Sequence, residues 1–460
     1  MNNLVFKDVC YTNLDEFVFG VAKKPIHCTN GMVIGGGTVY PEINFTLPPM
    51  LISEATMPKV KAQYEEMIHG VCAKAHELHV PGMLVEIELL PPCTFNPQWG
   101  IEVTKVIKEV MMEYEAKFNL KSLLRMTPVD IREGKKLKHM YRGEHWDNLM
   151  ETFRGCGEAG ADFLAIESVG GKNLHDEAVM NCDLLKALFA LGVVGTHDMT
   201  ILWDNIVKIA GQTNSLASGD TACGFANTSM VMANKNFIPK VFAAVDRVMS
   251  AVRTLVAVER GAVGPDKDCG YEGVYLKAIT GTPISMEGKS SACAHSSTVG
   301  NIAACLADCW SNESVENVRL LGGMAPTISL ENLAYDCRLM NVASSRGKAM
   351  DMRDMLAESD RQFDPQAYIL DPSVVLKLSQ KIVKGQTHFE RTKIAASATI
   401  QELRDAHKNG AVLLEDREVR YLDIIEEQLN SVPNDKEEFL QAMIKTTTPD
   451  KFDPAKYDLI

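Results

Sequence analysis

The sequence has no compact motif for binding a metal or a phosphate group. It contains no CxxC pair and no HExxH pattern, so its cysteines and histidines form no short zinc signature. The glycine run 35–37 lacks the Lys-Ser/Thr pair that completes a phosphate-binding loop, and no helical pattern follows it directly. Internal repeats and low-complexity tracts are also lacking. An active site must therefore be assembled from residues that are distant in the sequence.

Long hydrophobic runs and an excess of basic residues are lacking as well. No apolar stretch reaches the roughly 18 residues that a membrane span needs, and the start MNNLVFKDVCYTNLDEF does not have the pattern of a secretory signal. The 47 Lys and Arg against 60 Asp and Glu give a net charge of −13. Because such a surface repels phosphate backbones and anionic lipids, we expect no nucleic-acid and no membrane partner. We expect a cytoplasmic protein whose twelve cysteines are thiols.

The chain is long enough for one large domain with extensions, since it has 460 residues of which 46% are hydrophobic. Residues 1–56 are rich in Gly, Pro and Thr, and we expect a loop-rich N-terminal extension there. Regular patterns begin near residue 57 and continue to about 350. Residues 351–460 are charged, with apolar residues at helical spacing in 374–385, 399–410 and 417–432, so we expect a helical C-terminal extension.

Between 57 and 350, strand-like and helix-like segments alternate. Helices are expected at 57–80, 101–118, 144–159, 176–190, 235–258 and 298–309. Strands are expected at 83–90, 122–130, 162–168, 190–198, 283–288 and 317–323. Such alternation is typical of a parallel sheet, and a count near eight favours a closed (β/α)₈ TIM barrel over an open doubly wound sheet.

In a barrel, polar residues at the carboxyl ends of strands form the active site. On the expected strands these are Glu86 and Glu88, Asp130, Glu167, and His197 with Asp198. Each also has a purely structural interpretation. The first two glutamates could pair with Lys or Arg, the two aspartates could cap helices, and the histidine could be an ordinary hydrogen-bonded residue.

Three cysteines lie in polar segments and are harder to explain as core residues. Cys223 and Cys269 lie in expected loops rich in Gly and Asp, and Cys293 lies in SSACAHSS beside His295. Cys305 and Cys309 instead have apolar neighbours at helical spacing, which predicts core positions. Spacing alone does not select a metal-binding pair among twelve cysteines.

Two long blocks carry a resemblance to a known family. GDTACGFANTSMVMANKNFIPKV at 219–241 and the block from GPDKDCGYEG to LLGGMAP at 264–326 resemble the zinc subunit of methanol:corrinoid methyltransferase, and FLAIESVGGK at 163–172 matches as well. The resemblance implies a TIM barrel with one zinc ion (Zn²⁺) at its mouth. It implies that Glu167, Cys223 and Cys269 bind the metal and take part in catalysis through it.

The resemblance also implies a reaction and partners. The methyl group of methanol would pass to the Co(I) corrinoid, of the cobalamin type, of a small partner protein in methylotrophic methanogenesis or acetogenesis, with zinc as Lewis acid on the methanol oxygen. A homo-oligomer and a hetero-complex with the corrinoid protein are expected. Glu88, Asp130 or His295 could protonate the leaving oxygen, and Asp220 and Asp268 could orient the ligands.

Three other functions stay open on the residues alone. The same scaffold could use another methyl donor, such as a methylamine, a methyl thiol or a methoxylated aromatic compound. A zinc hydrolase would use a metal-activated water and would turn over without corrinoid. A scaffold with a structural zinc would have four protein ligands and no open position.

Overall fold

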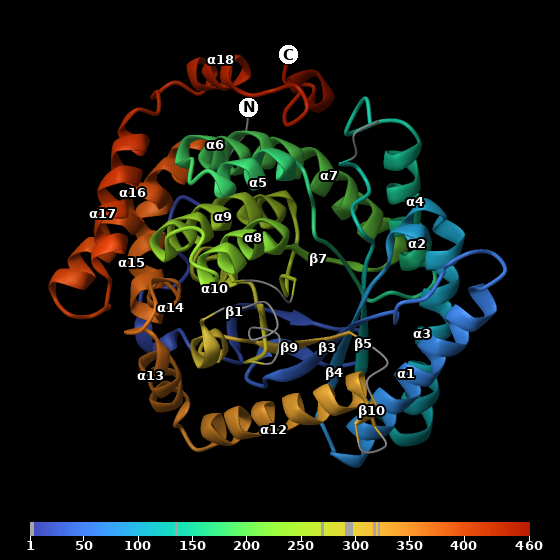
Figure 1. The fold of residues 1–460 in the computed structure, drawn as a ribbon. Helices are drawn as coiled ribbons and strands as arrows, with labels where there is room; N and C mark the ends of the chain where they lie inside the picture. Colours follow the sequence, from blue (N-terminus) through green and yellow to red (C-terminus); the bar gives the residue numbers. More distant parts are fainter. Residues whose placement is uncertain (1–3, 134–136, 268–270, 290–297, 316–318, 321–322) are drawn as a thin grey trace.

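The protein is an α/β structure built on a curled parallel sheet. The computed structural model describes residues 4–133, 137–267, 271–289, 298–315, 319–320 and 323–460. The main sheet has seven strands in the order β7-β6-β5-β4-β3-β9-β8, and each neighbouring pair is parallel. Its strands are β3 (Tyr40–Thr46), β4 (Met83–Glu88), β5 (Ser122–Thr127), β6 (Phe163–Ile166), β7 (Leu216–Asp220), β8 (Ser285–Glu287) and β9 (Cys309–Val315). Figure 1 shows the sheet curling inside a ring of helices.

Helices connect the strands and cover the outside of the sheet. In this part of the chain they are α1 (Met57–Glu77), α2 (Pro91–Phe95), α3 (Pro97–Phe118), α4 (Glu144–Glu158), α5 (Lys172–Met180), α6 (Leu184–Phe189), α7 (Thr196–Thr213), α8 (Cys223–Asn234), α9 (Lys240–Arg260), α10 (Gly273–Thr280) and α12 (Ala325–Ser345). In α1, Val60, Tyr64, Met67 and Val71 recur every three or four residues and are buried, so the apolar stripe faces the core. The alternation of strands and helices predicted from the sequence is confirmed.

Two apolar clusters lie on opposite faces of the sheet. The larger one fills the space between the sheet and the helices. The smaller one lies inside the curl, where Leu84 and Leu123 of the sheet meet Ile26 and Ile34. The last two residues belong to an antiparallel hairpin of β1 (Val21–His27) and β2 (Val33–Gly36). The hairpin therefore covers the amino-terminal end of the sheet interior and leaves the carboxyl-terminal end for a site.

The edges of the sheet, β7 and β8, both contact the segment 262–267. The amide of Val263 donates to the carbonyl of Ala217 at 2.9 Å, and the amide of Gly264 donates to the carbonyl of Ser218 at 2.8 Å. On the other side, Asp266 accepts a 2.8 Å hydrogen bond from the backbone of Ser285 in β8. The segment thus follows the direction of β7 and reaches the opposite edge of the sheet.

We expected the segment before residue 57 to be irregular. This expectation was wrong where the segment forms strands. Tyr40–Thr46 forms β3, which pairs with both β4 and β9 near the middle of the sheet. Glu42 and Asn44 within this strand conceal its hydrophobic pattern, although both side chains are fully buried. Glu42 is neutralised by Arg125 at 2.9 Å, so its burial is compatible with a central strand. The boundaries of the three proposed parts of the chain stay a prediction.

The strand expected at 190–198 was also wrong. Ala190–Gly195 is a π-helical turn (η2) between α6 and α7, so the whole stretch is helical. A short apolar run fits a buried helix as well as a buried strand, and here every residue of η2 is buried. The continuous helical stretch Leu184–Thr213 is apolar enough to cross a membrane by composition, but 72% of the relevant window is buried in the protein. It is therefore a core helix of this fold.

Two further expectations need correction in the segment before α12. The helix predicted at 298–309 is only the short 3₁₀ helix η3 (Gly300–Ala304), and Cys309 begins β9 instead of ending a helix. Cys305 and Cys309 are nevertheless fully buried, as core residues should be. Of the strand predicted at 317–323, Arg319–Leu320 (β10) pairs with Gly323–Met324 (β11) in a separate small hairpin, and the remaining positions lie outside the described residues.

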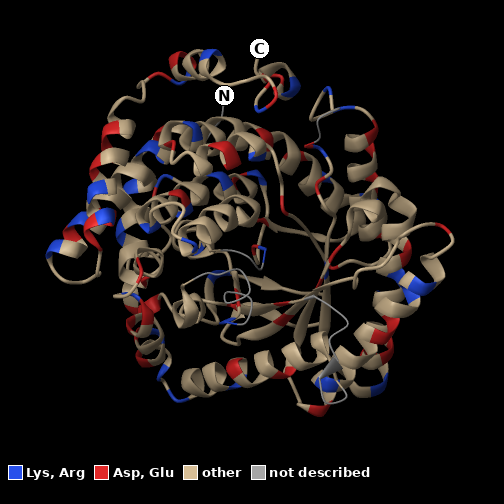
Figure 2. Ribbon diagram, in the orientation of Figure 1, with Lys and Arg blue, Asp and Glu red and all other residues tan. Residues whose placement is uncertain are grey.

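The chain after residue 348 is helical, as predicted. Its helices are α13 (Ala349–Asp360), α14 (Pro365–Tyr368), α15 (Pro372–Ile382), α16 (His388–Lys408), α17 (Asp416–Asn430), α18 (Lys436–Thr446) and the 3₁₀ helix η4 (Pro454–Tyr457). Figure 1 shows α16 and α17 packed beside α9, and α18 continuing past α6 to the C-terminus. Charged residues lie on the outer helices, and a further group lies at the centre of the sheet (Figure 2).

Candidate active site at the carboxyl ends of the strands

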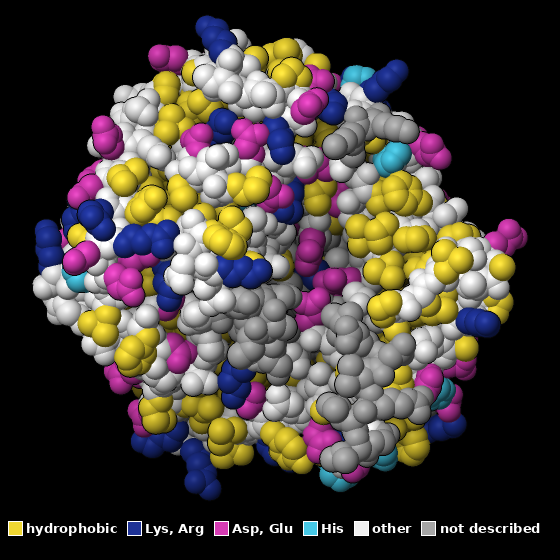
Figure 3. Space-filling view, viewed as in Figure 1, with side chains coloured by type: hydrophobic (Ala, Val, Ile, Leu, Met, Phe, Trp, Pro, Cys, Tyr) yellow, Lys and Arg dark blue, Asp and Glu magenta, His cyan; other side chains and the backbone are white. Residues whose placement is uncertain are grey.

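Acidic side chains gather in a hollow near the centre of the face shown in Figure 3. Two of the predicted residues, Glu86 and Glu88, lie in β4 and surround the fully buried Lys267. The Lys267 Nζ lies 3.1 Å from an Oε of Glu86, 2.5 Å from an Oε of Glu88 and 3.2 Å from an Oε of Glu167. Both β4 glutamates thus pair with a lysine, as their structural interpretation expected. Sequence reasoning missed Lys267, although it lies only two residues before Cys269.

Glu167 directly follows β6 and lies at the mouth of the sheet, as predicted. Its side chain is 33% exposed, whereas Glu86 and Lys267 are fully buried. β6 is short and apolar, and its register pairs Ile166 with Asp220 of β7. The carboxylate therefore stands on a rigid strand end and still reaches the hollow.

Cys223 stands at a second strand end, but not in the loop that the sequence predicted. β7 ends at Asp220, and Cys223 is the first residue of α8, with 5% of its surface exposed. The backbone before it is held by side chains. Thr221 Oγ1 accepts from the Cys223 amide at 3.0 Å, and Glu272 Oε1 accepts from the Ala222 amide at 2.6 Å. The amino end of α8 carries the positive end of the helix dipole, which favours an anionic ligand there.

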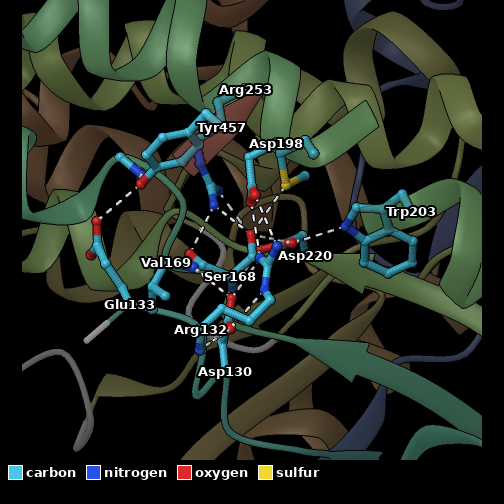
Figure 4. A network of polar contacts seen from close by, with 12 residues as sticks. Asp130, Arg132, Glu133, Ser168, Val169, Asp198, Trp203, Asp220, Arg253 and Tyr457 are labelled. Atoms are coloured by element: carbon cyan, nitrogen blue, oxygen red, sulfur yellow. Dashed lines mark hydrogen bonds and ion pairs between the residues drawn. The ribbon is translucent and has the colours of Figure 1, made fainter. Parts of the chain in front are cut away.

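Asp220 connects the segments that carry Glu167 and Cys223 (Figure 4). Its carboxylate accepts from the Ser168 amide at 3.2 Å, the Ser168 hydroxyl at 2.7 Å and the Trp203 indole at 2.9 Å. Arg253 lies 3.7 Å away. Burial raises the pKa of Asp220, and the charge of Arg253 and these hydrogen bonds oppose that shift. The predicted orienting role of Asp220 is supported by this position between the two strand ends.

The predicted residues Asp130 and Asp198 share one buried arginine. Arg132 lies 2.8 Å from an Oδ of Asp130 and 2.9 Å from an Oδ of Asp198, and all three side chains are fully buried (Figure 4). Neither aspartate is a helix cap, because α4 begins at Glu144 and the residue before α7 is Gly195. Asp130 also accepts from the Val169 amide at 3.0 Å, so this ion-pair network steadies the segment after Glu167.

His197 is a hydrogen-bonded structural histidine. It lies on α7, and its Nε2 donates to the carbonyl of Tyr457 at 2.8 Å. Burial lowers its pKa from the ordinary value. The predicted position of His197 at a strand end was therefore wrong, and its interpretation as an ordinary hydrogen-bonded residue was right.

Several predicted residues lie outside the described residues, namely Cys269, Asp268, Cys293 and His295. Among the residues that the structure describes, no group of three or more His, Cys, Asp and Glu side chains could hold a metal ion. Glu167 nevertheless directly follows β6 and Cys223 lies three residues after the adjacent strand β7, and a carboxylate and a thiolate are both ordinary zinc ligands. These two residues fit a metal site that Cys269 would complete.

Comparison with known proteins gives full-length matches. The model of the Methanol-cobalamin methyltransferase B subunit family matches residues 4–458. A methanol--corrinoid protein co-methyltransferase of Methanosarcina barkeri is 38% identical over 440 residues, which cover 95% of this chain and 94% of that protein. The crystal structure of the methanol:cobalamin methyltransferase complex MtaBC from Methanosarcina barkeri superposes with a TM-score of 0.94 at 37% identity, covering 98% of this chain and 99% of that one. This chain therefore belongs to the Methanol-cobalamin methyltransferase B subunit family.

Proposed function

We propose that this methanol:corrinoid methyltransferase binds one zinc ion at the mouth of its sheet through Glu167, Cys223 and Cys269. The observation that carries the proposal is the position of the first two residues, at the carboxyl ends of the neighbouring strands β6 and β7. Three protein ligands would leave one open position for a substrate, as a catalytic zinc requires. Bound zinc would supply Lewis acidity toward the methanol oxygen, which is otherwise a poor leaving group.

The residues around the ligands act by holding them in place. Asp220 binds the segment after Glu167 and lies three residues before Cys223, so one carboxylate restrains both strand ends. Glu272 holds the turn before α8 through the Ala222 amide and also accepts from Thr254 at 2.7 Å. Such partners of metal ligands usually change metal affinity by about 10- to 100-fold when they are replaced.

The departing oxygen also needs a proton, and the contacts favour Glu88 as its source. Both oxygens of Asp130 are engaged by Arg132, and one of them also accepts from Val169. Glu88 is 20% exposed at the end of β4 and accepts from Asn44 at 2.9 Å. Both carboxyl groups take part in ion pairs, that of Glu88 with Lys267 and that of Asp130 with Arg132, but only the carboxyl group of Glu88 is partly exposed at the hollow. His295 lies outside the described residues.

The finer features of the fold and the assembly are part of the same proposal. The segment 262–267 would take the eighth position of a closed (β/α)₈ barrel, because it hydrogen-bonds along β7 and reaches β8. The corrinoid would be carried by a separate protein, since the similar Methanosarcina barkeri structure is a complex named MtaBC. We also propose self-association and a cytoplasmic location.

Zinc content and methyl transfer together test the proposal. Wild-type protein mixed anaerobically with methanol and Co(I) cobalamin should form methyl-cobalamin, which is followed by absorbance. Cys223→Ala and Cys269→Ala should lose both zinc and transfer, whereas the matched variant Cys337→Ala, in a buried position on α12, should keep both. Full zinc content with normal transfer in the Cys223→Ala protein would refute the ligand assignment.

A further inference from the structure

The segment that follows Glu167 is held by side chains from other parts of the chain. Between β6 and α5, the Ser168 amide donates to Asp220 at 3.2 Å and the Val169 amide donates to Asp130 at 3.0 Å. Asp220 is the last residue of β7, and Asp130 lies three residues after the end of β5. Because buried backbone amides need acceptors, these carboxylates determine the path of the chain directly after Glu167.

A third amide in this segment donates a hydrogen bond to a residue near the C-terminus. The Gly171 amide donates to the hydroxyl of Tyr457 at 2.9 Å, across 286 positions of sequence. The same hydroxyl donates to Glu133 at 3.2 Å, and Glu133 also accepts from the Asn173 amide at 3.2 Å (Figure 4). Gly171 has a φ of +88°, a backbone conformation that favours glycine, and its amide at the start of α5 is held by this contact.

Tyr457 is well placed to act as a fixed anchor. It is 4% exposed, and its carbonyl accepts from His197 at 2.8 Å. Its ring lies 5.8 Å from that of Phe452, which packs edge-on against Phe189 at 5.2 Å. Contacts with α6 and α7 thus hold Tyr457 in position, and these contacts do not involve the loop that its hydroxyl binds.

Among the described residues, the rest of the C-terminal segment makes few hydrogen bonds with these loops. A cavity of about 200 Å³ lies between residues 449–457, the loop that carries Glu133 and the start of α5 at Asn173. The backbone connection is a 2.9 Å hydrogen bond from the Met140 amide to the Lys456 carbonyl. Figure 1 shows this last segment, in red, lying apart from α17 and beyond α5 and α6. Within the described part of the chain, the hydroxyl of Tyr457 therefore connects the segment to the mouth of the sheet through Gly171 and Glu133.

We propose that residues 449–457 form a strap, and that Tyr457 is a positioning residue for the loop that holds Glu167. The inference rests on the proposed zinc function for its chemical consequence, because a looser loop would present the carboxylate less firmly to the metal. Without the hydroxyl, the Gly171 amide would lose its acceptor, and the path from Glu167 to α5 would lose one of its side-chain restraints, which also include Asp220, Asp130 and Arg253.

Tyr457→Phe is the decisive variant, because it keeps the aromatic packing and removes only the hydroxyl. Native-state hydrogen exchange in the peptide spanning 167–175 should become about tenfold faster, which corresponds to the loss of one buried hydrogen bond. Zinc release to a chelator should accelerate about tenfold as well. The matched control is Tyr335→Phe, whose hydroxyl lies 3.4 Å from Glu331 on the exposed face of α12 and should change neither rate.

The two measurements separate the strap from the zinc proposal. Wild-type exchange in the Tyr457→Phe protein would overturn the strap. Faster exchange with unchanged zinc release would overturn the positioning of Glu167, and a purely structural role would lower thermal stability alone. If the wild-type protein binds no zinc, the proposed function fails, whereas the exchange measurement still decides whether the strap restrains the loop.

Discussion

Replacing Asp220 by Asn should destabilise the protein by about 2–5 kcal/mol and loosen its metal site. One Oδ of Asp220 accepts from both the Ser168 hydroxyl and the Trp203 indole, and the other accepts from the Ser168 and Thr221 amides. The asparagine side chain keeps one oxygen as an acceptor, but its NH₂ group would face the donors that bind the other carboxylate oxygen in the wild type. The serine hydroxyl can rotate, but the indole N–H cannot, so at least one buried donor is orphaned at about 1–3 kcal/mol. Loss of the charge that faces Arg253 adds about 1–2 kcal/mol.

Thermal unfolding of zinc-free protein measures this loss. The unfolding entropy is about 2.1 cal/mol/K per residue, so cooperative unfolding of the chain implies a decrease in the unfolding midpoint of about 2–5 °C. The control is Asp204→Asn, because Asp204 pairs with Arg260 at the surface and should contribute less than about 1 kcal/mol. The Asp220→Asn protein should also release zinc about tenfold faster. A midpoint within 1 °C of wild type, equal to that of the control, would refute the central role of this carboxylate.

Three further predictions concern the loops around Asp220. Burial raises the pKa of Glu133 to about 7, so the native state binds this proton more tightly than the unfolded chain, and wild-type stability falls as the pH rises from about 4.5 through 7. The unfolding free energy of Glu133→Gln, relative to that of wild type, should therefore rise by about 1–2 kcal/mol between pH 5 and pH 8. Thermal midpoints of both proteins across that range measure this change. A difference between the two midpoints that stays constant with pH would contradict the prediction. Arg132→Met should cost about 3–5 kcal/mol at pH 7, because Asp130 and Asp198 stay buried without a cation, and mild acid should partly restore its midpoint. Gly170→Ala should cost about 1–3 kcal/mol, because the new Cβ would lie 2.2 Å from the Asp198 carboxyl carbon; unchanged denaturant midpoints would show that the loop adapts.

The sequence predicted the elements whose pattern is local. The helix from residue 57 has an apolar stripe of regular spacing, and the strand around Glu86 has apolar residues between its glutamates, so both were identified correctly. Patterns that depend on tertiary context were misread. The run 190–198 looks like a buried strand, yet it is helical because a fully buried helix shows no polar face. Tyr40–Thr46 looks like a loop because its charged residue is neutralised by an arginine 83 positions later.

For the candidate site too, the sequence predicted local features but not the contacts between distant segments. The strand end at Glu167 followed from the sequence, and the family resemblance selected Cys223, but neither revealed the partners that hold them. Lys267 and Tyr457 come from segments with no local signal of a site. Contacts across 100 to 286 positions depend on how the chain closes around the sheet, and hydrophobic periodicity carries no information about them.

The polar interior of the sheet offers a more general criterion for finding such sites. Strands of a parallel sheet that are buried on both faces usually read as continuous hydrophobic runs. Here β4 alternates between apolar and acidic residues, a pattern that ordinarily indicates a strand with one face in water, yet Glu86 is fully buried. Burying a charge costs several kcal/mol unless a partner neutralises it, as Lys267 does for Glu86 and Arg125 does for Glu42. Because apolar residues would serve the core equally well at these positions, alternating charges in a strand of a parallel α/β fold indicate the functional end of its interior.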